Sequence, residues 1–224
     1  MRHQEYNHDK YHDLFIKKKI NAEALKIALD NRKYEIENYW KRATYFWTFI
    51  AATLAGFIAV QTSSSSPAKT DISVLLCSLG IIFSFGWFCA NKGSKYWQEN
   101  WENHVNLLED EIIGPLHKVV LHRNNRQNII DFINQVLTGP LPVSVSKINH
   151  IISLYITIIW IGLLFYALPP FNIDAPINLY YVSLIILTAF TCIGFIFFSK
   201  TYTGDYYNRL ILRNATIVND YDID

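Results

Sequence analysis

The sequence contains four apolar runs that are each long enough to cross a membrane. They comprise residues 43–60, 72–90, 148–168 and 179–198, and none has an Asp, Glu, Lys or Arg in its interior. About 20 apolar residues span the hydrocarbon core of a bilayer. The sequence therefore predicts an all-α integral membrane protein with four transmembrane helices.

The basic residues are distributed unevenly between the segments that connect these runs. Of 20 Lys and Arg, ten precede the first run, six lie between the second and third, and three follow the fourth, which leaves only Lys69 elsewhere. Basic residues are retained on the cytoplasmic side of membranes, so we expect both termini to be cytoplasmic. The predicted segments are cytoplasmic N-terminal helices (1–42), a first transmembrane hairpin (43–90), a cytoplasmic helical region (91–147), a second transmembrane hairpin (148–198) and a cytoplasmic tail (199–224).

Composition excludes several classes of function. The net charge is +1 and there is no dense basic block, so no nucleic-acid partner is expected. The three cysteines all lie inside apolar runs, where packing is their simplest role, and no disulfide is predicted. The connecting segments 61–71 and 169–178 are too short for an external domain. No cofactor is predicted.

The first two apolar runs continue into polar sequence without a helix breaker. There is no Gly or Pro between Ala22 and Ala55, and no Pro from Ile72 to Ile113. We expect one helix over 22–60, about 58 Å long, and a second over 72–113, about 63 Å long, which Gly114 and Pro115 end. The two would form an antiparallel hairpin with its turn near Ser66, extending into a cytoplasmic helical layer.

The polar halves of these helices carry apolar stripes at helical spacing. On the returning helix the stripe is Trp97, Trp101, Val105, Leu108 and Ile112, and on the outgoing helix it is Leu25, Ala28, Leu29, Ile36, Tyr39 and Trp40. Such stripes are expected to bury against each other or against a neighbouring subunit. Glu99, Glu102, Glu109 and Asp110 are predicted on the opposite face of the returning helix.

Arg32 lies within the outgoing stripe, level with roughly Asn100 if the turn centres near Ser66. Its guanidinium could stack on Trp97 or Trp101. Alternatively it stays hydrated while its stem covers apolar surface. Either role is structural rather than catalytic.

The run Glu109–Glu111 is typical of a solvated, acidic helix end. Acidic groups at a helix C-terminus are mildly unfavourable, so a cationic partner is expected, for which Lys17, Lys18 and Lys19 are candidates. The lysines could instead contact anionic lipid.

The histidines do not form a recognisable site. His8 and His12 have a metal-chelating spacing, but two residues are not a full site and a solvated helix face is the better interpretation. His104 is expected to make a structural hydrogen bond rather than act as a base. We therefore predict no metal site and no catalytic residue, and expect the protein not to be an enzyme.

Small residues line the first two spans. Ala52 and Gly56 are four apart in the first span, and Ser73, Cys77, Gly80 and Ser84 follow four-three-four spacing in the second. Small residues allow close approach of membrane helices. The pattern is compatible with packing within one subunit and with packing between subunits.

Two segments carry a family resemblance. They are Tyr39–Trp47, with the sequence YWKRATYFW, and Trp97–Glu111, with the sequence WQENWENHVNLLEDE, followed by Gly114-Pro115-Leu116. Over residues 39–116 the chain resembles bacterial inner-membrane proteins of the RipA type, which are described as octameric. The resemblance implies a ring-like homo-oligomer, such as an octamer, in a bacterial cytoplasmic membrane, and it supplies no catalytic motif.

These observations lead to one functional hypothesis and one alternative. The hypothesis is a non-enzymatic, homo-oligomeric inner-membrane protein whose partners are the lipid bilayer, other copies of itself and an unknown cytoplasmic protein, with a role as a scaffold or in stress responses. The alternative is a gated pore or a membrane-disrupting effector of antiphage type, with the cytoplasmic layer as its sensor.

Overall fold

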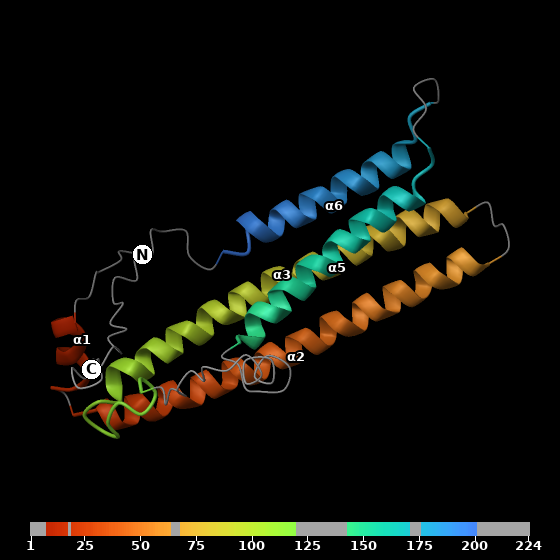
Figure 1. Cartoon of the computed structure of the whole chain (residues 1–224). Helices are drawn as coiled ribbons and strands as arrows, with labels where there is room; N and C mark the ends of the chain where they lie inside the picture. Colours follow the sequence, from red (N-terminus) through yellow and green to blue (C-terminus); the bar gives the residue numbers. More distant parts are fainter. Residues whose placement is uncertain (1–7, 18, 64–67, 120–142, 171–175, 201–224) are drawn as a thin grey trace, which may run out of the picture. The chain divides into compact units, whose positions relative to one another are not determined.

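The computed structural model describes residues 8–17, 19–63, 68–119, 143–170 and 176–200 (Figure 1). Its helices are α1 (His8–Phe15), α2 (Asn21–Thr62), α3 (Lys69–Leu108), α5 (Val145–Ala167) and α6 (Leu179–Phe197). Of these, α2, α3, α5 and α6 are long and apolar enough to cross a membrane. The predicted all-α fold with four membrane-spanning helices is confirmed.

The two longest helices extend well beyond the width of a bilayer. Helix α2 has 42 residues and α3 has 40, which correspond to about 63 and 60 Å at 1.5 Å per residue. Helix α2 matches its prediction within two residues at each end. Helix α3 ends at Leu108, five residues before the predicted Ile113, because the chain then enters a series of turns.

The shorter helices begin at polar caps. Ser144 precedes α5, and its hydroxyl accepts a hydrogen bond from the backbone N–H of Lys147. Asn178 precedes α6 and accepts from the N–H of Tyr180 at 3.0 Å. Both caps satisfy backbone donors that have no partner inside the helix.

The chain divides into two compact units. Unit 1 comprises residues 1–34, 98–143 and 204–224, and unit 2 comprises residues 35–97 and 144–203. The ends of the predicted first transmembrane hairpin, at residues 42 and 91, fall seven to eight residues inside unit 2. The prediction places them where the apolar runs of the sequence start and end. The helix-like pattern around 129–137 and the tail from residue 201 lie outside the described residues.

Unit 1 has a small core between the N-terminal part of α2 and the C-terminal part of α3. Leu25, Ala28, Val105 and Leu108 are buried there, and a second group of partly buried residues packs around them: Tyr11, Phe15, Ala24, Leu29, Trp101 and Ile112. These segments carry charged residues and are the parts of α2 and α3 outside the apolar runs. Burial from water contributes about 1.5–3 kcal/mol for each fully buried Leu or Val.

Helix α3 is the centre of unit 2. Half of the residues in its apolar stretch are buried, against 22% for α2, 28% for α5 and 6% for α6. This high burial follows from its position, because α3 contacts each of the other three helices.

Aromatic pairs set the register of α2 against α3. Phe49 stacks on Phe83 with ring centroids 5.2 Å apart, and Trp47 meets Trp87 edge-on at 6.0 Å. The midpoints of these pairs fall at residues 66 and 67. The hairpin register therefore agrees with a turn centred near Ser66.

Glycines bring α3 close to α5 and α6. A Cβ added at Gly80 would overlap the indole ring of Trp160 from α5, and one added at Gly86 would lie 3.3 Å from the ring of Phe195 from α6. Near the start of α3, Asp71 accepts a hydrogen bond from the hydroxyl of Tyr181 at 2.7 Å. Gly80 leaves room for one aromatic ring, and Gly86 for two, because a Cβ there would also lie 3.3 Å from the ring of Phe46 in α2.

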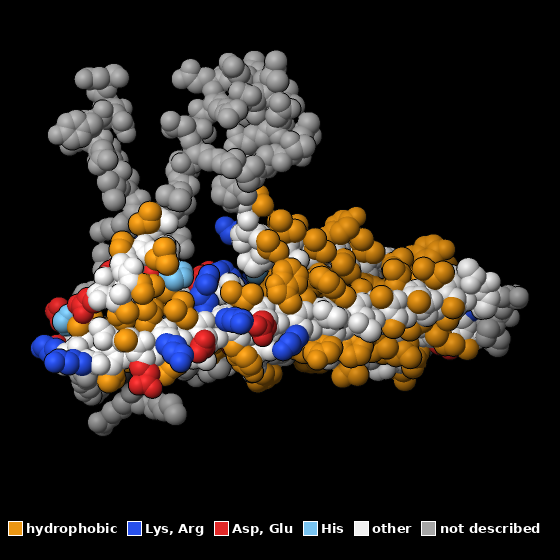
Figure 2. All heavy atoms as spheres, turned by 90° about the horizontal axis from the view of Figure 1, so that it is seen from below, with side chains coloured by type: hydrophobic (Ala, Val, Ile, Leu, Met, Phe, Trp, Pro, Cys, Tyr) orange, Lys and Arg blue, Asp and Glu red, His pale blue; other side chains and the backbone are white. Residues whose placement is uncertain are grey.

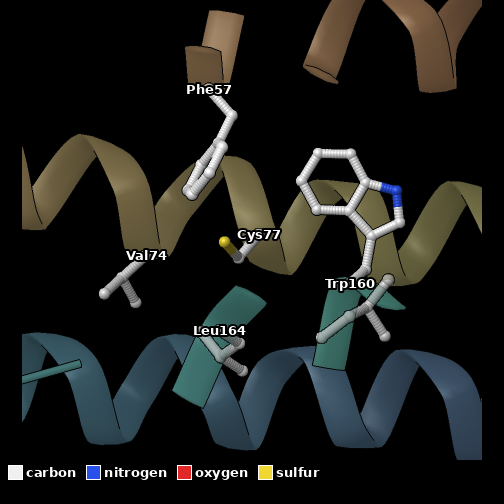
Figure 3. Packing of buried hydrophobic residues seen from close by; sticks show 6 residues of the cluster. Phe57, Val74, Cys77, Trp160 and Leu164 are labelled. Atoms are coloured by element: carbon white, nitrogen blue, oxygen red, sulfur yellow. The ribbon is translucent and has the colours of Figure 1, made fainter. Parts of the chain in front are cut away.

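The core of unit 2 is built around these approaches (Figure 3). Its buried residues come from α2, α3 and α5: Phe57, Val74, Cys77, Ile81, Trp160 and Leu164. The rings of Phe57 and Trp160 meet edge to face, with centroids 6.2 Å apart. In a bilayer the lipid tails are themselves apolar, so close packing rather than escape from water stabilises such a core.

The outer surface of unit 2 is strongly apolar. Helix α6 buries only Thr188 and leaves Leu179, Phe190 and Phe197 more than 60% exposed. Figure 2 shows hydrophobic side chains covering a broad part of one face, while Lys, Arg, Asp and Glu side chains are interspersed over another part. A surface of this composition is typical of contact with lipid or with other membrane helices.

Replacing Gly80 with Ala tests the contact with Trp160. We expect a loss of about 1–3 kcal/mol, the usual cost of overpacking, measured as a lower melting temperature of the detergent-solubilised protein. The double variant Gly80→Ala with Trp160→Leu should recover part of the loss, because the smaller side chain leaves room for the added methyl group. Gly162→Ala is the matched control, since nothing lies within 4 Å of a Cβ built there. Equal melting temperatures for Gly80→Ala and Gly162→Ala would contradict the proposed contact.

Candidate functional site

The stripe of the returning helix packs inside the subunit in unit 1. Val105 and Leu108 are buried, with 1% and 3% of their surfaces exposed, and Trp101 and Ile112 pack on the same core. Leu29 joins them from the outgoing helix. These residues contribute to hairpin packing, and a role for them in contacts between subunits stays a prediction.

Other stripe residues are placed in unit 2. Trp97 and Ile36 are partly buried, and Trp97 meets Tyr96 edge-on at 5.6 Å. Trp40 is 44% exposed and lies edge-on to the buried Tyr39. Trp40 is therefore the stripe member with the most surface left for another contact.

Arg32 forms an ion pair instead of the aromatic stack that is one of its two predicted roles. Its Nε lies 3.7 Å from Oε1 of Glu102, and both side chains are about one-third exposed. The midpoint of this pair is residue 67, as the hairpin register predicts. The prediction that Glu102 lies on the opposite face is wrong, because Glu102 borders the stripe and its side chain reaches Arg32.

Glu109 differs most from its predicted environment. The sequence pattern assigned it to a solvated helix end, but its side chain is fully buried. Its Oε2 accepts a hydrogen bond from the backbone N–H of His117 at 2.9 Å and pairs with the His117 ring at 2.8 Å. Oε1 has no hydrogen-bond partner among the described residues.

The position of Glu109 also explains why α3 ends early. The backbone N–H groups of Ile112 and Ile113 both bond to the carbonyl of Glu109, and Gly114 has φ of +75°. The chain thus turns back so that His117 reaches the Glu109 carboxylate. A Glu followed eight residues later by His across a Gly-Pro turn is the signal in the sequence, but helical periodicity obscures it.

The acidic run pairs with basic residues other than the expected Lys17, Lys18 and Lys19. Asp110 pairs with Lys118 at 2.5 Å, and Glu111 lies 3.5 Å from Nε2 of His12. Lys17 pairs with Asp13 within its own segment. Lys18 lies outside the described residues.

His104 makes the structural hydrogen bond that its sequence context predicts. Its Nδ1 lies 2.8 Å from the hydroxyl of Tyr11, and its ring lies beside Trp101 with centroids 5.5 Å apart. Burial lowers the pKa of His104 and raises the pKa of Tyr11 to about 12. The tyrosine hydroxyl can therefore donate to a neutral imidazole.

The small residues of the second span are mostly buried within unit 2. Ser73, Cys77, Gly80 and Ser84 are all buried, and Ser73 accepts a hydrogen bond from the side chain of Gln61 at 3.0 Å. Ser73, Cys77 and Gly80 face α2 or α5 of the same subunit. Contacts between subunits would need other surfaces of the spans.

The small pair of the first span behaves differently. Ala52 is exposed. Gly56 is partly buried, and a Cβ built there would make ordinary contact with Leu76 at 3.5 Å. Ala52 thus stays available for a neighbouring helix, whereas Gly56 serves the hairpin.

Many polar groups inside unit 2 are satisfied locally or in pairs, whereas four buried atoms have no hydrogen-bond partner among the described residues: Oγ of Ser78, Nε1 of Trp87, Nδ2 of Asn91 and Nε2 of His150. The hydroxyls of Ser84 and Thr157 donate to carbonyls four residues earlier in their own helices. Asn149 donates to the hydroxyl of Tyr39 at 2.7 Å, and both side chains are buried. The link between Asn149 and Tyr39 joins α5 to α2 across 110 residues of sequence, and no local pattern predicts it.

No group of three or more His, Cys, Asp or Glu side chains in the part of the chain that the structure describes could hold a metal ion. The three cysteines are free thiols. The ring of His150 lies 2.6 Å from the carbonyl of Ser146, one turn earlier in α5.

Four apolar helices, two of which continue into charged segments, define a multi-pass membrane protein. The model of the octameric membrane protein family (8xMP) matches residues 22–169, which is most of the chain. The chain belongs to this family, whose name describes self-association in a membrane. The resemblance to octameric membrane proteins, seen over residues 39–116, is confirmed at this level, while the narrower RipA type stays a prediction. No curated protein and no solved structure matched the chain.

Truncation of Glu109 tests its link to His117. Glu109→Ala leaves the backbone N–H of His117 without its acceptor, and we expect a loss of about 1–3 kcal/mol and faster limited proteolysis after residue 108. Asp110→Ala is the control, because its pair with Lys118 is exposed and worth about 0–1 kcal/mol. If both variants melt alike, the Glu109 contact does not stabilise unit 1.

The environment of His104 predicts a dependence of stability on pH. The folded state favours neutral His104, whereas the unfolded chain takes up the proton near its ordinary pKa of about 6.5. The contribution is therefore present above about pH 6.5 and is lost as the pH falls below it. Melting temperatures measured from pH 7.5 to about pH 5 should fall less steeply for His104→Gln than for the parent. Parallel curves would show that His104 is not the group responsible.

Proposed function

We propose that this protein is a non-enzymatic, homo-oligomeric scaffold of the bacterial inner membrane, in which unit 1 is presented to the cytoplasm as an interaction surface. The observation that carries the proposal is the construction of α2 and α3. Each combines an apolar stretch long enough to span a bilayer with a charged extension that has its own core. Membership of the octameric membrane protein family supports self-association.

The proposed orientation rests on the basic residues. Nineteen of the 20 Lys and Arg precede the first span, lie between the second and third, or follow the fourth. The positive-inside rule then assigns these segments, including both termini, to the cytoplasm. A binding partner for unit 1 would accordingly be a cytoplasmic protein.

The proposal leaves catalysis out because the candidate groups are engaged in structural contacts. His104 bonds to Tyr11, His117 to Glu109 and Arg32 to Glu102. A general base needs to reach a substrate proton, and these groups are instead held between segments of one subunit.

The alternative of a pore would need a path between subunits. Within unit 2 the hydroxyls of Ser84, Thr157 and Thr188 donate to their own helices. Helix carbonyls thus occupy these three donors, while Oγ of Ser78 and Nδ2 of Asn91 have no partner among the described residues. A pore lined by several copies would make the membrane permeable to ions.

Two measurements on the full-length protein test the proposal. Native mass spectrometry of detergent-solubilised protein should give one defined multiple of the subunit mass. Expression in bacteria should leave the membrane potential intact, as measured with a voltage-sensitive dye. A monomer would contradict the scaffold, and depolarisation that is lost in an assembly-deficient variant would favour the pore. Reporter fusions placing either terminus in the periplasm would contradict the orientation.

A further inference from the structure

We propose that the exposed face of α2 in unit 1 binds α2 of a second copy of this chain, with the two helices parallel. This inference rests on the proposed self-assembly and names the surface that performs it. It is carried by rows of exposed side chains that repeat every seven residues.

Three rows run along this face. The apolar row consists of Ile27 and Tyr34. The acidic row consists of Glu23 and Asp30, and the basic row consists of Lys26 and Lys33. Side chains seven residues apart on a helix point in nearly the same direction, within about 20°. In order around the helix the rows are therefore apolar, acidic and basic.

All six side chains are exposed in the single subunit. Ile27 is 52% exposed and Tyr34 is 59% exposed, although the neighbouring Leu25 and Ala28 are buried in the core of unit 1. Helix α2 thus uses one face for its own hairpin and leaves a second face, apolar along one edge, without cover from the described part of the subunit.

The heptad period identifies the kind of occupant. Side chains spaced seven residues apart stay on one seam where two helices wrap around each other. In α2 the acidic and basic rows both lie on the same side of the apolar row. Copies inserted in one membrane with the same orientation are related by an axis along the membrane normal. The facing helices therefore run parallel.

The arrangement of charge fits a ring. In a closed ring each subunit contacts its neighbours through two different surfaces. Helix α2 offers two chemically different edges, apolar and acidic on one side and basic on the other. The acidic row of one copy then lies beside the basic row of the next, which gives attraction at every interface.

Unit 2 gives an independent indication on the same helix. Within the span, the heptad positions that continue the acidic and apolar rows are exposed, and all except Ile58 are small: Thr44, Thr48, Ala51, Ala55 and Thr62. Small residues permit close contact between membrane helices. The family match also covers α2 from residue 22 and ends before α6.

Charge exchange on the full-length protein tests the interface. A basic variant carries Glu23→Lys and Asp30→Lys, and an acidic variant carries Lys26→Glu and Lys33→Glu. Alone, each places like charges at every interface, and we expect about a tenfold or greater weakening of assembly, measured as smaller species by native mass spectrometry. Co-expressed and purified through a tag on one of them, the two should restore the parent mass in a one-to-one ratio.

The co-expression separates contacts between copies from effects within one helix. If these charges only support the helix through neighbours three or four residues apart, mixing the variants cannot restore assembly, and that result would overturn the inference. Unchanged mass for both single variants would overturn it too. The control is Asp13→Lys with Asp110→Lys, which makes the same change in net charge as the basic variant at exposed positions outside α2 and should leave the mass unchanged.

The outcome for the parent protein distinguishes this inference from the proposed function. A monomeric parent would overturn self-assembly itself, and with it the α2 interface. A parent oligomer that persists in both variants would overturn the interface alone. Circular dichroism of each variant verifies that its helices are formed.

Discussion

The structure of unit 2 depends on the close packing of one helix against three others. Helix α3 can approach α5 and α6 closely because it presents glycine where their aromatic rings arrive, and it meets α2 partly through its own aromatic residues Phe83 and Trp87. The indole of Trp160 occupies the space above Gly80, and Phe195 lies against Gly86. Since lipid offers these rings an equally apolar environment, shape rather than hydrophobicity selects the arrangement.

In unit 1 a different interaction, the hydrophobic effect, stabilises the packing of α2 and α3. There the charged segments require water, and Leu25, Ala28, Val105 and Leu108 are held together by burial from it. Ion pairs and hydrogen bonds, such as Arg32 with Glu102 and Tyr11 with His104, border this core. Side-chain identity along α2 and α3 changes accordingly, from small and aromatic to amphipathic.

The spans, the long hairpin and its register can be predicted from the sequence, because length, periodicity and the absence of helix breakers are local properties. The same patterns identify Val105 and Leu108 as core and Gly80 as a point of close approach. They do not predict the Asn149–Tyr39 and Tyr181–Asp71 links, since these join residues 110 positions apart. The pattern assigns Glu109 wrongly to a solvated helix end, because the helical periodicity continues past the residue at which the chain turns back toward the Glu109 carboxylate.

The hydroxyl groups of the spans have a consequence for biogenesis. The hydroxyls of Ser84, Thr157 and Thr188 each donate to a carbonyl of their own helix. The free-energy cost of placing these hydroxyls in lipid is therefore the same before and after the helices pack together. A group such as Asn149, in contrast, must wait for another helix to supply a partner. Insertion by the translocon and later consolidation of the bundle can therefore proceed as separate steps.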